Sequence, residues 1–308
     1  MAIASADRVR LAYVVESIPG TTPTTPALQI VRLTGESLDV TRENIVSSEL
    51  RADRNVMDLI QVGGGAGGSV DIELSYGSYD AILEGALQGS WTNNVLKNGV
   101  TPKSFTLERR LTDVSPNVHF FFRGMHVNGF SLKCATKEIV TGSFEFLGMS
   151  GAVAESAISG ATYIDATTTD VMDAASGFAG FSVAGLSGVH VSSLSLDATN
   201  NLRAPTAAGS VDALGIGAGR FELSGSLEAY FEDIKLYEAF LDGDATALAF
   251  TLGSTAGEKY TFTIPNIKFE TGTVQAQGND SDIMASMTYR GLYDSVNGCT
   301  LMIERGVA

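Results

Sequence analysis

The 308-residue chain is predicted to fold as a mainly β (α+β) protein with two tandem, duplicated β-sandwich or barrel domains. Three observations lead to this fold class. Short runs of Val, Ile, Thr, Phe and Tyr recur between 34 glycines, which favours strands joined by turns. Several motifs occur twice in the same order, and each half holds one segment with helical periodicity. Each domain is therefore expected to carry one short helix packed on its sheet and one long extended loop.

The repeated motifs keep their order along the chain, with small changes of offset that fit loop insertions. The matched stretches are 37–39 with 195–197, 50–52 with 202–204, 68–70 with 225–227, 83–89 with 237–243, and 142–148 with 285–291. We predict a first domain at residues 1–154 and a second at 155–308, joined by a small-residue linker near 148–160. One large β domain with similar turns, or an unrelated pair of sheets, would be the alternative.

Each half is expected to open with a strand, at 28–33 and at 189–196, and then to make a long excursion. These excursions, 39–67 and 197–219, exceed the roughly 12 to 15 residues that structureless loops usually reach, which favours a role in binding or assembly. The first one mixes both charge signs, through Arg42, Glu43, Glu49, Arg51, Asp53 and Arg54. Such an arm can pair with the opposite charges of a neighbouring molecule.

A strongly alternating strand follows each excursion. In residues 220–232 the apolar set is Phe221, Leu223, Leu227, Ala229 and Phe231, and the opposite set includes Glu222, Ser224, Ser226, Glu228 and Glu232. The counterpart in the first half separates Val70, Ile72 and Leu74 from Asp71, Glu73 and Ser75, and its closing strand separates Phe144 and Phe146 from Ser143 and Glu145. The period of two predicts strands with one dry face and one acidic, hydroxyl-rich face. An ordinary solvent face is the simpler interpretation of any one such strand.

One short helix is expected after each alternating strand. The apolar stripe of the first consists of Tyr79, Ile82, Leu83, Ala86 and Leu87, with Gly89 placed to end it. The stripe of the second consists of Ile234, Tyr237, Phe240 and Leu241, with Asp233 as a candidate N-cap and Gly243 as its end.

The charge and the cysteines exclude several functional classes. With 20 basic and 35 acidic residues the net charge is −15, which opposes adhesion to nucleic-acid phosphates or anionic lipid. No apolar run reaches the length of a membrane span, and no signal peptide is evident, so a cytoplasmic origin is expected. Cys134 and Cys299 belong to no paired motif and are expected to be reduced structural thiols.

No motif in the sequence predicts an active site. His119, His126 and His190 lack metal-ligand spacing, and His119 beside three phenylalanines is expected to be a half-buried strand residue. The glycine run 63–68 lacks the Lys-Ser/Thr of a phosphate loop. Residues 278–282 lack the glycine and glutamate of a calcium loop, so a turn is expected there. No G-x-S-x-G elbow occurs. The chain is therefore predicted to be no enzyme and to need no metal or cofactor.

Several stretches of the first half together resemble a known family. They are DRVRLAYVVE at 7–16, GTTP at 20–23, LTGESL at 33–38, RADR at 51–54, DIELSYGSYD at 71–80, WTNNVLKNG at 91–99 and SFTLER at 104–109. This text resembles the tail tube (major tail) proteins of long, non-contractile-tailed bacteriophages. In the second half the likeness depends on the internal repeat, and 197–219 lacks the RADR spacing.

The resemblance implies a structural virion protein that is made and assembled in the host cytoplasm. Its rings would stack into a hollow tail tube whose acidic lumen conducts genomic DNA during ejection, without specific binding and without a membrane. Simpler tail tube subunits form hexamers, so a two-domain subunit would form a trimeric, pseudo-hexameric ring. The implied partners are the tape measure protein and tail chaperones during assembly, and the tail completion (terminator) and distal tail proteins at the tube ends.

Two sets of residues are candidates for these roles. The DNA-repelling lumen lining would consist of Asp71, Glu73, Ser75, Ser143, Glu145, Glu222, Glu228 and Glu232. The ring–ring interface would use Arg42, Glu43, Glu49, Arg51, Asp53 and Arg54. The alternative is a monomeric β-sandwich protein of the carbohydrate-binding or adhesin-like virion class. That class needs an exposed aromatic platform, and Trp91 is the single tryptophan.

Overall fold

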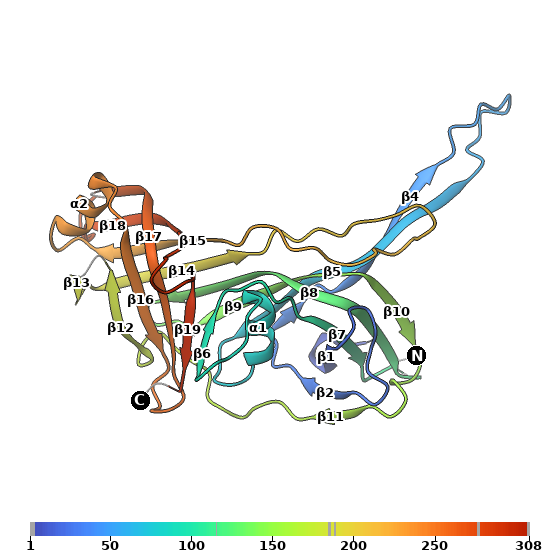
Figure 1. The fold of residues 1–308 in the computed structure, drawn as a ribbon, viewed down its shortest axis with the longest axis horizontal. Helices are drawn as coiled ribbons and strands as arrows, with labels where there is room; N and C mark the ends of the chain where they lie inside the picture. The colour runs from blue at the N-terminus through green and yellow to red at the C-terminus, as the bar shows by residue number, and fades with distance from the viewer. Residues whose placement is uncertain (1–3, 115, 184–185, 188, 276–277, 307–308) are drawn as a thin grey trace.

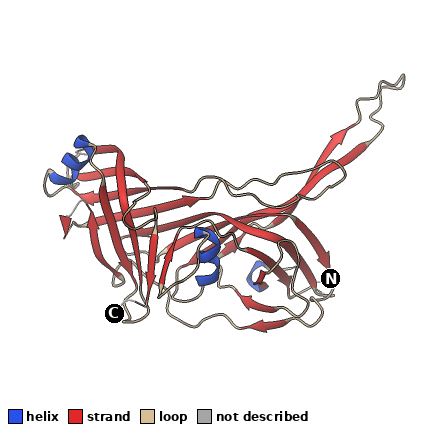
Figure 2. Ribbon diagram, viewed as in Figure 1, coloured by secondary structure: helices blue, strands red, loops and turns tan. Residues whose placement is uncertain are grey.

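Strands make up most of the computed structural model, which describes residues 4–114, 116–183, 186–187, 189–275 and 278–306 (Figure 2). The first part contains η1 (Ala6–Arg8), β1 (Val9–Glu16), β2 (Ala27–Ile30), β3 (Gly35–Glu36), β4 (Asp39–Val46), β5 (Leu59–Glu73), α1 (Asp80–Leu87), β6 (Val95–Lys97), β7 (Ser104–Leu111), β8 (Val118–Ala135), β9 (Thr141–Gly148) and β10 (Ser150–Ala154). The second contains β11 (Thr162–Ile164), β12 (Phe178–Val183), β13 (Leu186–Ser187), β14 (Val191–Thr199), β15 (Glu222–Tyr230), α2 (Lys235–Asp242), β16 (Thr246–Leu252), β17 (Tyr260–Gln275), β18 (Met284–Gly291) and β19 (Met302–Arg305). The predicted mainly β class is confirmed.

One long antiparallel sheet runs through both halves of the chain. Its strands lie in the order β4, β5, β9, β8, β14, β15, β18 and β17. The first four strands come from the first half and the last four from the second, and they meet where β8 pairs with β14. This junction makes a single continuous sheet out of the two halves.

Two smaller sheets form the second layer and turn each half into a sandwich. In the first half β7 lies between β1 and β8, and β8 also pairs with β10. In the second half β16 lies between β12 and β17, and β17 also pairs with β19. The long strands β8 and β17 each pass from one layer to the other, so they fix the position of the long sheet on its core.

The two halves share irregularities as well as strand order. The β8–β9 ladder skips one residue between Val127 and Gly129, and the β17–β18 ladder skips one between Phe269 and Thr271. A second pair of bulges lies between 105 and 107 on β7 and between 246 and 248 on β16. These shared features allow residue-by-residue equivalence between the halves, whereas duplication of the sequence itself stays a prediction.

Matched serines occupy the same place in the two halves. The Ser69 N–H donates to Ser37 Oγ at 2.9 Å, and the Ser226 N–H donates to Ser195 Oγ at 3.0 Å. These are the serines of the repeated stretches 37–39 with 195–197 and 68–70 with 225–227. The repeated motifs therefore mark equivalent points of contact between two neighbouring chain segments.

The predicted linker and domain boundary do not coincide with a break in the fold. Residues 150–154 form β10 in place of the expected linker, because they pair with β8. Beyond the predicted boundary, β11 pairs in parallel with β2 of the first half, and β6 of the first half pairs with β19. Buried apolar residues of both halves form one core cluster.

The two predicted helices are present, and each packs on the strand that links the layers, α1 on β8 and α2 on β17. The stripe of α1 is buried as expected, but its left-handed C-cap is Gln88 (φ 48°) and not Gly89. In α2 the expected stripe is wrong in part, because Leu236 is the buried side chain while Ile234 and Leu241 are exposed. Gly243 ends α2 as expected, at φ 65°.

The first long excursion is a β-hairpin and not a structureless loop. β4 pairs with the first part of β5 from Asp39 to Val46, and the glycine run 63–68 lies within β5. The hairpin projects far from the body of the molecule (Figure 1). The second excursion folds back against its base, where Gly64 N–H donates to Val211 O at 2.9 Å. The predicted opening strands lie at β2 and β14, with slightly different ends.

Candidate functional site: a polar, hollowed sheet face

The long sheet carries one continuous polar face, opposite the face that packs on the core. Alternation places the apolar side chains of each strand inward, as for Phe130 and Leu132 of β8, which are 2% exposed. The intervening polar side chains therefore point away from the core. A first row of successive partners is Asp71, Ser143, Ser131, Asp197, Ser224, Arg290 and Lys268. A second row is Glu73, Thr141, Lys133, Ser195, Ser226, Thr288 and Thr271. We call this surface the polar face.

The polar face is hollowed where the two halves meet. A shallow cavity of about 500 Å³ lies over β5, β9, β8 and β14. Its polar lining comes from both halves and consists of Thr34, Asp71, Ser131, Lys133, Thr141, Ser143, Ser195 and Asp197. Short side chains line most of the hollow, so the sheet backbone lies close to its floor.

Hydrogen bonds across the strands hold the polar face in place. The Ser143 hydroxyl donates to Asp71 Oδ1 at 2.7 Å, and Asn128 Nδ2 donates to Glu145 Oε2 at 3.2 Å. Thr271 and Thr288 share a hydrogen bond at 2.7 Å. The carboxylates thus keep fixed positions on the surface.

Several cations of this face are close to carboxylates. Arg290 Nε lies 2.5 Å from Glu270 and its Nη1 lies 4.0 Å from Glu222. The hydrogen bond and charge of Arg220, with a smaller contribution from Arg290, hold the pKa of Glu222 below its usual range. Burial raises the pKa of Asp197. Arginines at this end of the face are therefore partly neutralised.

Six of the eight predicted lumen residues lie on the polar face, and two do not. Asp71, Glu73, Ser143, Glu145, Glu222 and Glu228 are on it. Ser75 is fully buried and hydrogen-bonds Ser78 at 2.6 Å, because the chain turns into the helix approach after β5. Glu232 lies beyond the end of β15 and pairs with His190.

Sequence reasoning missed three charged members of this face. Asp197 occupies its centre, and Lys133 and Lys268 place positive charge on it. The alternation of residues 193–199 indicates an outward-facing Asp197, and the alternation of residues 131–133 indicates an outward-facing Lys133. Strand pairing was needed to bring them together, so the face is more mixed in charge than its strands suggest singly.

Groups that could support catalysis are occupied or buried. Among the described residues no cluster of His, Cys, Asp and Glu could hold a metal ion. His119 Nδ1 lies 3.0 Å from Glu108, and His126 Nδ1–H donates to the Gly124 carbonyl at 2.9 Å. Both cysteines are buried and free, and burial raises the pKa of Cys134 to about 12. None of these groups lies on the polar face.

The residues predicted for the ring–ring interface all lie on the projecting hairpin. Arg42 and Glu43 belong to β4, and Arg51 pairs with Asp53 at 2.9 Å near the tip. The tip also exposes apolar side chains that charge reasoning missed, namely Ile45, Val46, Leu50, Val56, Met57, Leu59 and Ile60. An exposed apolar surface of this kind is typical of an interface that another protein covers.

The family model described as phage tail tube protein matches residues 6–291. No curated protein matches the chain. In the part of the chain that the structure describes, no helix is long and apolar enough to span a membrane.

Proposed function

The chain belongs to the phage tail tube protein family, and we propose that it assembles head to tail into rings of three subunits that stack into a tube and conduct DNA. Membership in this structural family implies a place in the virion and self-assembly with other phage tail proteins. We expect no catalytic activity. The observation that carries the proposal is the junction between β8 and β14, because it is an interface that the same chain can repeat between copies.

The two ends of the long sheet are complementary to each other. β8 pairs with β14 inside the chain, with Ser131 opposite Asp197. Counting from the shared bulges makes Thr273 of β17 the equivalent of Ser131. The repeated stretches 37–39 and 195–197 make Asp39 the equivalent of Asp197. Among the described residues, β4 and this part of β17 each pair on one side only. Unpaired strand edges readily take up another chain.

Joining these edges fixes a register between subunits. Residues 37–41 of one subunit would lie antiparallel to residues 271–275 of the next, with Asp39 opposite Thr273. Because each interface is head to tail, it forms a closed ring when the rotation closes. Two equivalent halves per chain would let three chains replace six single-domain subunits.

In such a ring the polar face lines the lumen. The apolar side of the sheet is already covered by α1, α2 and the smaller sheets, so the polar face is the side left for a water-filled bore. Its carboxylates would repel DNA phosphates, and its hydroxyls offer no strong charge to retain them. The projecting hairpin would reach the adjacent ring. Tape measure protein, tail chaperones, tail completion and distal tail proteins are the proposed partners.

A monomeric carbohydrate-binding or adhesin-like protein is less well supported. Trp91 offers no platform, because its indole N–H donates to the Asp80 carbonyl at 3.1 Å and the Arg305 guanidinium lies 4.5 Å from its ring.

A cysteine pair tests the ring. Asp39→Cys with Thr273→Cys places two thiols at directly opposite positions, where the Cβ atoms of antiparallel partners lie about 4.5–5.5 Å apart. Oxidation of assembled protein should give covalent dimers and trimers and nothing larger. Asp39→Cys with Ser286→Cys, one strand further in, is the control.

Each alternative has its own outcome. Crosslinked products of up to six chains would reject the trimer. Tubes that give no crosslinked products would reject this edge pairing. Dispersed monomers in electron micrographs at high concentration would reject assembly itself.

A further inference from the structure

A single buried methionine, Met172, extends the sheet of the first half at the place where β5 ends and β9 begins. Met172 N–H donates to the Leu74 carbonyl at 2.8 Å, and the Val140 N–H donates to the Met172 carbonyl at 2.9 Å. Its side chain is 5% exposed. Bridges from Val171 to Ser75 and from Asp173 to Ile139 flank it. Met172 lies just before β12, in the segment that leads into the second half. The second half therefore supplies this residue to the sheet of the first half.

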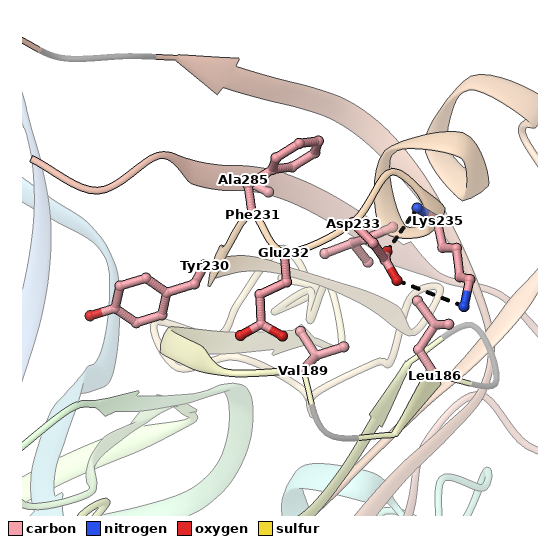
Figure 3. Close-up of a pocket in the computed structure, with 9 residues that line it drawn as sticks. Leu186, Val189, Tyr230, Phe231, Glu232, Asp233, Lys235 and Ala285 are labelled. Atoms are coloured by element: carbon pink, nitrogen blue, oxygen red, sulfur yellow. Dashed lines mark hydrogen bonds and ion pairs between the residues drawn. The ribbon is translucent and has the colours of Figure 1, made fainter.

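The equivalent place in the second half is a pocket. Phe231 corresponds to Leu74 and Ile283 to Val140, and the Phe231 N–H donates to the Ile283 carbonyl at 3.0 Å, as Leu74 does to Val140 at 2.9 Å. The two hydrogen bonds that Met172 makes have no counterpart here among the described residues. The pocket that remains is lined by Leu186, Val189, Tyr230, Phe231, Glu232, Asp233, Lys235, Leu236 and Ala285 (Figure 3).

The pocket suits one apolar side chain with its backbone. Its volume is about 130 Å³, and an engineered apolar cavity of roughly 150 Å³ holds a benzene-sized group. Figure 3 shows Leu186 and Val189 on one side, facing the strand end that carries Phe231 and Glu232. The lining thus combines apolar side chains with the charged Glu232, Asp233 and Lys235, beside the end of β15.

Counting along the chain identifies the segment that corresponds to Met172. Val9 opens β1 opposite Leu111, and Phe178 opens β12 opposite Leu252. Leu107 and Leu248 are equivalent, because each follows the bulge that the two halves share. Leu111 lies four residues after Leu107, and Leu252 lies four residues after Leu248. Six residues before Phe178 is Met172, and six residues before Val9 is Ile3. A turn at 174–177 precedes β12, and the single-turn 3-10 helix η1 (Ala6–Arg8) precedes β1.

We propose that the N-terminal segment of a second copy of this chain, with Ile3 at its centre, fills the pocket of the second half. The proposal rests on the ring assembly proposed above. At the internal junction the half that supplies β14 also supplies Met172. Between subunits, the copy that supplies residues 37–41 therefore also supplies Ile3. The N-terminal segment would thus add a latch to each ring contact, beside the pairing of the two sheet edges.

Mixed assembly of two single variants tests the latch. Subunits with Ile3→Cys are mixed with subunits with Val189→Cys before assembly, so that a disulfide between positions 3 and 189 must join two chains. Oxidised tubes should contain this covalent dimer, identified by mass spectrometry of the linked peptides. Ile3→Cys mixed with Val296→Cys is the matched control, because Val296 is 90% exposed and lies outside the pocket. The native cysteines are buried and should not interfere.

The outcomes separate the latch from the ring. Tubes that form without the 3–189 disulfide would overturn the latch and leave the ring intact, whereas wild-type protein that forms no rings would overturn the proposed function. In a chain that carries both Ile3→Cys and Val189→Cys, a disulfide within monomers would show that a chain fills its own pocket, which also overturns the latch. As a second measurement, Ile3→Asp should raise the protein concentration needed for ring formation at least several-fold, and Val100→Asp, at an 89% exposed position, should not.

Discussion

Gly225 is a position in the long sheet where one added methyl group is expected to be costly. A Cβ atom there would lie 2.5 Å from Cζ of Tyr289 and closer still to the Tyr289 hydroxyl and the Ser195 carbonyl. The Tyr289 hydroxyl donates to that carbonyl at 2.7 Å, directly beneath the glycine. Tyr289 is fully buried, so its ring has no free space to move into. Gly225→Ala must therefore displace the ring and break this hydrogen bond.

The cost follows from two separate effects. Overpacking of a filled core costs about 1–3 kcal/mol, and a buried hydroxyl that loses its partner costs about 1–3 kcal/mol more. A destabilisation of roughly 4 kcal/mol is expected, which corresponds to a fall in Tm of about 8 °C at roughly 2 °C per kcal/mol for a chain of this size. Calorimetry at matched protein concentration measures it, since assembly also shifts Tm.

Gly215→Ala is the matched control for Gly225→Ala. A Cβ atom at Gly215 meets no atom within 4 Å, so this substitution should change stability by less than about 1 kcal/mol. If Gly225→Ala proved as stable as Gly215→Ala, the close packing of the Tyr289 ring under β15 would be refuted.

Four further results are expected. Glu108→Gln should destabilise the fold by about 3 kcal/mol, measured by urea unfolding, because fully buried Glu108 pairs with Arg10 at 3.1 Å and with His119; an unchanged midpoint would contradict this. Burial lowers the pKa of His126, so stability should fall as pH drops below about 6.5, and His126→Gln should flatten that fall between pH 6.5 and 5.5. Replacing residues 47–58 by an Asn-Gly turn should leave rings that do not stack, as electron microscopy would reveal; normal tubes would exclude the hairpin from ring contacts. Lysines in place of Asp71, Glu145 and Glu228 should slow DNA ejection in a phage infection assay, and unchanged ejection would place these residues outside the lumen.

Local patterns predicted the strands and helices because each depends on a short stretch of chain. The alternation at 220–232 places Leu223 and Leu227 in the core, where both are at most 1% exposed, and Gly243 ends α2 because a left-handed residue is needed there. The prediction that Ser75 lies on the polar face was wrong because alternation holds only within a strand. The sequence does not mark that β5 ends at Glu73, before the turn that leads to α1.

Other features depend on pairing between distant strands and could not be predicted. The place of Lys133 on the polar face follows from its partners Thr141 and Ser195, one near in sequence and one far. Likewise β11 and β6 each join the sheet of the opposite half, so a boundary drawn at residue 154 cuts through shared hydrogen bonds. Composition identifies small-residue stretches but not whether they pair, which is why 150–154 was expected to be a linker.

The polar face changes how the charge of −15 bears on DNA passage. Residues 1–154 hold 13 basic and 16 acidic residues, and residues 155–308 hold 7 and 19, yet the face itself mixes carboxylates with Lys133, Lys268 and Arg290. Since charges are screened over about 8 Å at physiological salt, a phosphate responds to the few side chains beside it and not to the total. If this face lines a bore, as proposed, its mixture of hydroxyls, carboxylates and cations would present a phosphate with closely spaced charges of both signs. Smooth passage would then depend on the spacing of opposite charges along the bore more than on the acidity of the whole subunit.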